Sequence, residues 1–390
     1  MSIEGGKAIS SGKRIRLGMV GGGEGAFIGA VHRMAARLDD HYELVAGALS
    51  SSPAKARRSG KALGLASDRI YPDFASMAKA EAARPDGIEA VSIVTPNHVH
   101  APAARTFLDA GVHVICDKPL TTTLKEAKSL AAAAKKSGRI FALTHNYTGY
   151  PMVRQARDMV QKGQLGRIRI VQVEYVQDWL TERLEATGQK QAEWRTDPAR
   201  SGAGGCIGDI GTHAYNLADF ITGLPLTELS AELTTFVAGR ALDDNVQIML
   251  RYANGARGSL WASQVAPGNE NDLMIRVFGE KGGLSWRQVN PNYLTYSPYG
   301  QSPQIIGRNT AGAGPAAARV SRIPSGHPEG YLEGFATIYS EVAKAIFADR
   351  LGKKPPSEVL FPSVEDGVKG MAFIEAAVAS SLKGARWVTL

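Results

Sequence analysis

Short apolar segments alternate with helical ones over the first 145 residues, and this alternation constrains the fold more than any other feature of the chain. The apolar segments with strand character lie at residues 14–20, 43–49, 88–94, 113–116 and 139–144. The helical segments between them include residues 30–38, 101–110 and 124–136. Strands that alternate with helices of this length form βαβ units. The sequence therefore predicts an α/β domain with a doubly wound parallel sheet.

A glycine-rich turn joins the first strand to the first helix, with the sequence Gly-Gly-Gly-Glu-Gly-Ala-Phe-Ile-Gly over residues 21–29. Such a turn lets the backbone approach a pyrophosphate and directs helix N–H groups at it. If Gly21 and Gly23 are the first two glycines of a dinucleotide motif, the third is Gly29, three residues later than usual. A plain flexible loop is the alternative. The cofactor contacts predicted here are Gly21, Gly23, Gly25, Ala26, Phe27 and Ile28.

The end of the second strand carries no acidic residue. In NAD-binding folds, a carboxylate at this place binds the adenosine ribose hydroxyl. This chain has Ser50, Ser51 and Ser52 instead, and Lys55, Arg57 and Arg58 follow. The basic residues either accommodate the extra phosphate of NADP or form a solvated helix face. We therefore expect Ser50 and Ser51 to contact a cofactor that is NAD or NADP.

A lysine stands just past the fourth apolar strand, in the sequence Asp117-Lys118-Pro119. Open α/β sheets bind their ligands outside the carboxyl ends of the strands. Pro119 restricts the backbone of Lys118 to extended conformations, so the ammonium group is presented in a fixed direction. An ordinary lysine in a surface turn is the alternative.

The end of the third strand is a second place where ligand contacts are expected. The predicted cofactor contacts there are Thr95, Pro96, Asn97 and His100, and those after the fourth strand are Asp117 and Lys118. For His98 and His100, a hydrogen-bonded structural role is the alternative.

After residue 145 the pattern changes to strands without intervening helices. These strands are predicted at residues 167–175, 228–237, 245–252, 256–264, 273–278 and 283–288. Asn254-Gly255 is a strong hairpin signal between two of them. The second half is therefore predicted to be an α+β domain around an antiparallel sheet. Residues 301–328 are predicted to form a long loop, and residues 331–348 and 364–382 two closing helices.

Asp209 and His213 are the candidates for proton transfer in the second half. They are four residues apart, so on a helix they share one face. A carboxylate that orients an imidazole makes His213 a plausible proton carrier near neutral pH. The glycines at 202, 204 and 205 would let a ligand approach the backbone closely. A solvated or buried structural pair is the alternative.

Composition excludes several classes of protein. A chain of 390 residues exceeds what one core usually holds, so two domains are expected. The net charge is +8, but no basic run is longer than a pair, so no nucleic-acid partner is expected. Cys116 and Cys206 are isolated, which argues against zinc or a disulfide framework and for a reducing compartment, the cytoplasm. Residues 1–13 read as a loose leader without a signal peptide, and no apolar run is long enough for a membrane span.

Together these residues resemble the Gfo/Idh/MocA oxidoreductase family, which includes glucose–fructose oxidoreductase and inositol dehydrogenase. The resemblance extends from Arg14 to about Lys383. It rests on the glycine turn, on the segment from Thr95 to His100, on Asp117-Lys118-Pro119, and on the segment from Trp194 to His213. It implies a Rossmann NAD(P)-binding domain at 1–145. It also implies an α+β domain at 146–390, with a large, mainly antiparallel open sheet for substrate binding and oligomerisation.

The resemblance implies catalytic roles for Lys118, Asp209 and His213. In this family a Glu-Lys-Pro triplet supplies a lysine near the nicotinamide, and a later Asp and His complete the site. Three departures stand out: Asp117 replaces the glutamate, the glycine turn carries an insertion, and Asn216 stands where an aspartate often follows the histidine. The expected substrate contacts are Lys118, Asn146, Tyr147, Trp194, Arg195, Asp209 and His213, with no metal.

The expected function is an NAD(P)-dependent oxidoreductase that transfers a hydride between nicotinamide and a secondary hydroxyl of a sugar, anhydrosugar or cyclitol. The resemblance implies a homodimer or homotetramer formed through the open face of the second sheet, with no membrane partner. One alternative is a glycosidase that uses tightly bound NAD as a transient hydride shuttle and releases product without net cofactor reduction. The other is a non-catalytic sensor of a dinucleotide or sugar, which would have no need of a proton carrier.

Overall fold

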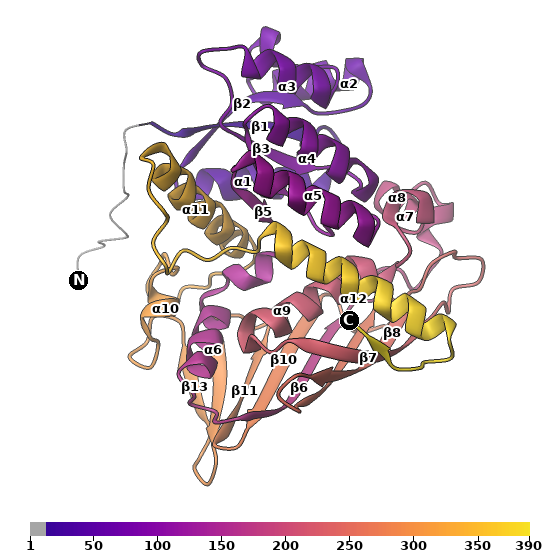
Figure 1. Cartoon of the computed structure of the whole chain (residues 1–390), viewed down its shortest axis with the longest axis vertical. Helices are drawn as coiled ribbons and strands as arrows, with labels where there is room; N and C mark the ends of the chain where they lie inside the picture. Colours follow the sequence, from indigo (N-terminus) through magenta and orange to yellow (C-terminus); the bar gives the residue numbers. More distant parts are fainter. Residues whose placement is uncertain (1–12) are drawn as a thin grey trace. The chain divides into compact units, whose positions relative to one another are not determined.

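The computed structural model of the chain describes residues 13–390 (Figure 1). Contacts within the chain divide it into two compact units. Unit 1 comprises residues 13–121, 125–149 and 331–368, and unit 2 comprises residues 122–124, 150–330 and 369–390. The predicted leader lies outside the described residues apart from Lys13.

Within the described residues, unit 1 is built on a parallel sheet of five strands. They are β1 (Ile15–Gly21), β2 (Tyr42–Ala48), β3 (Ala90–Val94), β4 (His113–Cys116) and β5 (Phe141–Leu143). Their order is β2-β1-β3-β4-β5, and neighbouring strands pair in parallel. A parallel bridge between Gly47 and Ile70 adds a rudimentary strand beside β2. With this strand counted, the order is the Rossmann order 3-2-1-4-5-6, which confirms the predicted fold class.

One helix from the end of the chain belongs to unit 1. The helices of this unit are α1 (Phe27–Leu38), α2 (Pro53–Ala62), α3 (Phe74–Ala82), α4 (His100–Asp109), α5 (Leu124–Ser137) and α11 (Tyr331–Arg350). In Figure 1, α11 runs beside the sheet and α1, and Phe335 and Ile338 of α11 share a core with Leu17 of β1 and Val31 of α1. The predicted second domain comprises residues 146–390, whereas α11 packs with the first sheet. Periodicity marks which side chains are buried but not which element buries them.

Unit 2 is built on a sheet that has nine strands within the described residues. They are β6 (Ile168–Val176), β7 (Leu226–Thr234), β8 (Asn245–Tyr252), β9 (Arg257–Ser263), β10 (Asp272–Gly279), β11 (Gly282–Arg287), β12 (Tyr293–Pro298), β13 (Gln304–Gly307) and β14 (Val388–Thr389). The order is β13-β12-β11-β10-β6-β9-β8-β7-β14. Neighbours are antiparallel except β6 and β9, so the predicted open, mainly antiparallel sheet is confirmed. The turn at Asn254-Gly255 joins β8 to β9, as expected.

Helices cover one face of this sheet. The helices of unit 2 are α6 (Pro151–Gln161), α7 (Lys190–Arg195), α8 (Pro198–Ser201), α9 (Thr212–Thr222), α10 (Pro315–Ala318) and α12 (Val364–Leu382), the last of which starts in unit 1. Both α6 and α9 lie against the sheet (Figure 1). The uncovered face presents Ile170, Met249 and Phe278, which are 45%, 56% and 37% exposed.

The prediction of one long loop over residues 301–328 is wrong in part. This segment contains β13, which pairs with β12, and the short helix α10. A buried ion pair organises it: the guanidinium of Arg308 lies 2.8 Å from the carboxylate of Glu329 and donates to the carbonyl of Ile323. Charged groups, rather than large apolar side chains, hold this segment in its fold. The composition of the segment therefore suggested a loop.

None of the helices between residues 13 and 390 combines the length and the apolar character that crossing a membrane requires. Across the same residues, no group of three or more histidine, cysteine, aspartate or glutamate side chains is arranged to hold a metal ion.

Candidate active site

The turn between β1 and α1 brings its glycines together despite their wide spacing in sequence. Gly21 and Gly22 have φ angles of 79° and 70°, in the left-handed region that favours glycine. A Cβ atom on Gly29 would lie 2.3 Å from the Cα atom of Gly22, so α1 packs against the turn only because residue 29 is a glycine. Close packing of the helix is the role of the third glycine in dinucleotide motifs. Gly29 fills that role, and the inserted residues lengthen the turn without disrupting it.

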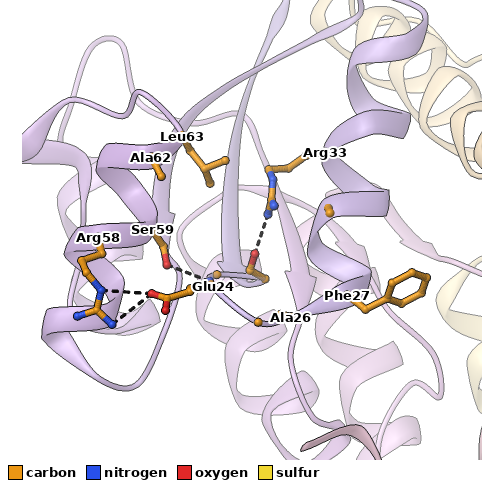
Figure 2. A pocket seen from close by; sticks show the side chains of 12 residues that line it. Glu24, Ala26, Phe27, Arg33, Arg58, Ser59, Ala62 and Leu63 are labelled. Atoms are coloured by element: carbon orange, nitrogen blue, oxygen red, sulfur yellow. Dashed lines mark hydrogen bonds and ion pairs between the residues drawn. The ribbon is translucent and has the colours of Figure 1, made fainter.

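An open pocket of about 690 Å³ lies beside this turn (Figure 2). It is lined by Gly22, Gly23, Glu24, Gly25, Ala26, Phe27, Ala30, Arg33, Arg58, Ser59, Ala62 and Leu63. Gly23 approaches the end of β2 so closely that a Cβ atom would lie 2.6 Å from the carbonyl oxygen of Leu49. The pocket also contains the start of α1, and the N-terminus of a helix of this length favours an anion. The residues present therefore fit the phosphates and adenosine of a dinucleotide.

Lys118 follows β4 at the carboxyl edge of the unit 1 sheet, and hydrogen bonds to Asp117 hold its turn in place. The backbone N–H of Lys118 and the hydroxyl of Thr144 both donate to Oδ1 of Asp117, each at 2.9 Å. The backbone N–H of Asp117 donates to the carbonyl of Ile93 in β3 at 2.9 Å. The Lys118–Pro119 peptide bond is cis. Asp117 therefore ties the lysine's turn to the strands on both sides of β4.

His100 bridges two strand ends from a fully buried position. Its Nδ1 lies 2.8 Å from the carbonyl oxygen of Pro119 and its Nε2 lies 2.9 Å from that of Thr95. A neutral imidazole donates through only one ring nitrogen, so both carbonyls receive an N–H only when the ring is protonated. Burial lowers the pKa of His100, while the carboxylate of Asp117 opposes this effect. His100 was predicted to contact the cofactor. In the structure its ring instead connects two strand ends, because both ring nitrogens lie within hydrogen-bond distance of backbone carbonyls.

Residues 145–147 lie directly after β5 and are buried in unit 1. Burial and the ammonium of Lys118 lower the pKa of His145 to about 3, so this ring is neutral near pH 7. Asn146 is 1% exposed, and its Nδ2 has no hydrogen-bond partner within residues 13–390. An amide buried in this way is available to a ligand. Tyr147 is 3% exposed in the same turn, η3 (Asn146–Gly149).

Asp209 and His213 lie on consecutive helical turns of unit 2. Asp209 is in a π-helical turn, η5 (Ile207–Gly211), and His213 is in the first turn of α9. The prediction assumed a regular α-helix, and a π-helical turn is wider than that. Such turns are rare and occur frequently at functional sites.

Neighbouring side chains fix both groups. Oδ2 of Asp209 accepts a hydrogen bond from Nε2 of Gln264 at 2.9 Å and lies 3.4 Å from Nε of Arg195. His213 is 8% exposed, and its ring packs edge-on against Tyr175 with centroids 6.1 Å apart. The guanidinium of Arg195 also stacks on the ring of Trp194 at 4.3 Å. The predicted residues Trp194, Arg195, Asp209 and His213 all belong to unit 2.

Asp243 holds the start of the π-helical turn through hydrogen bonds. This role was not predicted from the sequence. Its carboxylate accepts hydrogen bonds from the backbone N–H groups of Gly205 at 2.6 Å and Ile207 at 2.8 Å. Burial raises the pKa of Asp243 to about 6. A Cβ atom on Gly205 would lie 2.3 Å from the carbonyl oxygen of Asp243, so the glycine is required for this close approach. The only local signal was the pair Asp243-Asp244 before an apolar strand, a pattern that usually marks a solvated turn.

We expect Asp243→Asn to destabilise unit 2 by about 1–3 kcal/mol, because the amide NH₂ would face a buried backbone N–H that has lost its acceptor. Urea unfolding followed by tryptophan fluorescence measures this, since all five tryptophans lie in unit 2. The matched control is Glu232→Gln, which changes an exposed carboxylate in the same unit. Equal stability of the two variants would contradict the role assigned to Asp243.

The structure brings some of the predicted cofactor contacts together and leaves others apart. Gly23, Gly25, Ala26 and Phe27 line the pocket, whereas the described lining does not include Gly21, Ile28, Ser50 or Ser51. Thr95, Pro96 and Asn97 follow β3 at the same sheet edge as Lys118. Arg58, considered from the sequence only as a ligand of the extra NADP phosphate, also lines the pocket, and the lining residues that were not predicted are Gly22, Glu24, Ala30, Arg33, Ser59, Ala62 and Leu63. They come from the turn and from two helices, at positions that no motif marks.

Comparison with known proteins identifies the family. Residues 15–145 match the family model described as "Oxidoreductase family, NAD-binding Rossmann fold", and residues 153–285 match the GFO/IDH/MocA C-terminal domain. An oxidoreductase structure from Sinorhizobium meliloti is 58% identical, covers 96% of this chain and 99% of its own, and has a TM-score of 0.88. An inositol dehydrogenase homolog from Azotobacter vinelandii, complexed with NAD+, is 36% identical over 97% and 98% of the two chains, with a TM-score of 0.94. Levoglucosan dehydrogenase of Pseudarthrobacter phenanthrenivorans is 28% identical over 96% of this chain and 98% of its own. The chain belongs to the Gfo/Idh/MocA family of oxidoreductases, and its first domain is the family's NAD-binding Rossmann fold.

Proposed function

We propose that this oxidoreductase acts on a secondary hydroxyl of a sugar, anhydrosugar or cyclitol, or catalyses the reverse reduction. The observation that carries the proposal is the fixed placement of Lys118 at the carboxyl edge of the unit 1 sheet, beyond the dinucleotide turn. The inositol dehydrogenase homolog and levoglucosan dehydrogenase support the substrate class. NAD supplies the hydride acceptor at C4 of its nicotinamide ring.

In the proposed mechanism, the side chains of this chain handle the proton and the charge. His213 accepts the hydroxyl proton, and Asp209, held by Gln264 and Arg195, orients the imidazole. Lys118 stabilises the negative charge that develops on the oxygen, as a fixed cation at that atom should.

A panel assay tests the proposed function. The purified protein is mixed with NAD+ or NADP+ and with a set of sugars, anhydrosugars and inositols, and nicotinamide absorbance is followed. A rise with one cofactor and a related group of polyols supports the proposal. No rise across the panel, with cofactor already bound to the purified protein, would favour hydride-shuttling glycoside cleavage, for which aryl glycosides are the next substrates to assay.

We expect His100→Asn to lower turnover by about 10- to 100-fold, because the shorter side chain cannot bridge Thr95 and Pro119 and a small displacement of Lys118 weakens catalysis strongly. The dissociation constant for NAD+ should change by less than about threefold, since His100 does not line the described pocket. Steady-state kinetics and calorimetric binding measure the two effects separately. Parallel losses of turnover, NAD+ affinity and melting temperature would point to general structural damage instead.

We propose that the open face of the unit 2 sheet forms the interface of a homodimer or homotetramer. Ile170, Met249 and Phe278 expose apolar surface there from three different strands, and exposed apolar surface of this kind marks interaction sites. Light scattering on the purified protein tests the assembly. A monomer at micromolar concentration would overturn the proposal.

We propose that the protein works in the cytoplasm. Cys116 and Cys206 are buried free thiols, and burial raises the pKa of both well above the usual value, so neither is a reactive thiolate. Cell fractionation tests the compartment, and recovery of the protein outside the cytoplasmic fraction would contradict it.

A further inference from the structure

The adenosine side of the dinucleotide pocket lacks the residue that usually recognises the ribose. In NAD-binding Rossmann folds, an acidic residue at the end of the second strand accepts hydrogen bonds from the ribose hydroxyls. Here β2 ends at Ala48, and Leu49 and three serines follow. Unless another carboxylate takes this place, the ribose hydroxyls have no charged acceptor.

Glu24 of the inserted turn supplies a carboxylate beside the end of β2. The backbone N–H of Gly23 donates to the carbonyl of Leu49 at 3.2 Å, so the turn is bonded directly to the residue that follows β2. The backbone N–H of Glu24 donates to the hydroxyl of Ser59 in α2 at 3.0 Å. Both bonds place residue 24 next to the end of the second strand, on the wall of the pocket.

An arginine of α2 holds the carboxylate at the pocket wall. Oε2 of Glu24 lies 3.3 Å from Nε and 3.2 Å from Nη2 of Arg58 (Figure 2). Both side chains are more than half exposed, so salt screens the pair and its contribution to stability is small.

We propose that Glu24 makes the enzyme selective for NAD over NADP, in place of the acidic residue that is missing from the end of β2. Its carboxylate accepts the hydrogen bonds of the adenosine ribose hydroxyls and repels a phosphate at the 2′ position. Because Glu24 neutralises Arg58, the pocket does not present that guanidinium to a phosphate. The inference deepens the proposed function and rests on its dinucleotide site, but not on the identity of the substrate.

Calorimetric dissociation constants for NAD+ and NADP+, measured without any carbohydrate, test this inference. We expect the natural protein to bind NAD+ at least about tenfold more tightly than NADP+, the selectivity of one hydrogen bond to a charged acceptor. Glu24→Gln should weaken NAD+ binding by about tenfold and strengthen NADP+ binding, because the repulsion is gone and Arg58 becomes available. Adding Arg58→Met to Glu24→Gln should remove the gain for NADP+. Glu43→Gln, an exposed carboxylate elsewhere on β2, is the matched control and should change neither constant.

The outcomes separate this inference from the alternatives. Tighter binding of NADP+ than of NAD+ by the natural protein would overturn it and make Arg58 the phosphate ligand. Equal changes in the dissociation constants of NAD+ and NADP+ in Glu24→Gln would also overturn it. Glu24 would then be only a partner in a surface ion pair. Because binding is measured without substrate, a failure of the proposed substrate class leaves these results unchanged, whereas failure to bind either dinucleotide would overturn both proposals.

Discussion

Replacing His213 or Lys118 by alanine is expected to lower turnover by about 10²–10⁴-fold, the usual effect of removing a positioned acid–base or charge-stabilising group. His213→Ala removes the proton acceptor, and Lys118→Ala removes the cation beside the reacting oxygen. Neither side chain lines the described dinucleotide pocket, so NAD+ affinity should stay within about threefold of the natural value. Steady-state kinetics on a substrate found in the panel, together with calorimetric NAD+ binding, measures both quantities.

Exposed residues of the same type provide matched controls for these variants. His327→Ala and Lys125→Ala remove an exposed histidine and an exposed lysine, and each should leave turnover unchanged. Near-normal turnover of either active-site variant on a confirmed substrate would show that the role assigned to that residue is wrong.

Unit 1 is expected to lose stability sharply between pH 6.5 and pH 4, because three buried histidines resist protonation. Burial lowers the pKa of His32 and His113 to about 4 and that of His145 to about 3, all below the ordinary value of 6.5. The unfolded chain therefore binds more protons than the folded one in this range, so stability falls as the pH falls and the full loss is reached below about pH 3. At pH 5 each histidine should lower the free energy of unfolding by about 2 kcal/mol relative to pH 7.5.

The measurement must report on unit 1, because Asp243 in unit 2 acts in the opposite sense. Its raised pKa of about 6 makes protonation favour the folded state. Hydrogen exchange followed by mass spectrometry reads β3 and α1 directly, and the opening free energies at pH 5 and pH 7.5 can be compared after correction for the intrinsic exchange rates.

The variant His32→Phe measures how much one of the three histidines contributes to the pH dependence of stability. Nδ1 of His32 lies 2.9 Å from the hydroxyl of Tyr339 and 3.2 Å from that of Ser92, and these two hydroxyls also bond each other at 2.8 Å. The hydroxyl pair can therefore persist without the imidazole. The variant should lose about 2 kcal/mol of the pH dependence, and the exposed His327→Ala should keep all of it. An unchanged pH dependence in His32→Phe would contradict the assignment.

The features that depend on local pattern could be predicted from the amino-acid sequence. Alternating apolar and helical segments were enough to predict the parallel sheet of unit 1, and successive strands without intervening helices, with the hairpin signal at Asn254-Gly255, were enough to predict the antiparallel sheet of unit 2. The position of Lys118 after β4 followed from one strand and one proline. These features are readable because strand and helix periodicity, and turn chemistry, are properties of a few consecutive residues.

The contacts between residues that are distant in the sequence became known from the folded structure. It placed Gly29 against Gly22 across the insertion and brought Asp243 to the start of the π-helical turn. His100, expected to contact a ligand, connects two strand ends instead. Glu24 lies beside the end of β2. Each of these contacts joins residues that are separated in the sequence, through close packing or through a hydrogen bond, and nothing in the neighbouring sequence specifies which residue the partner is.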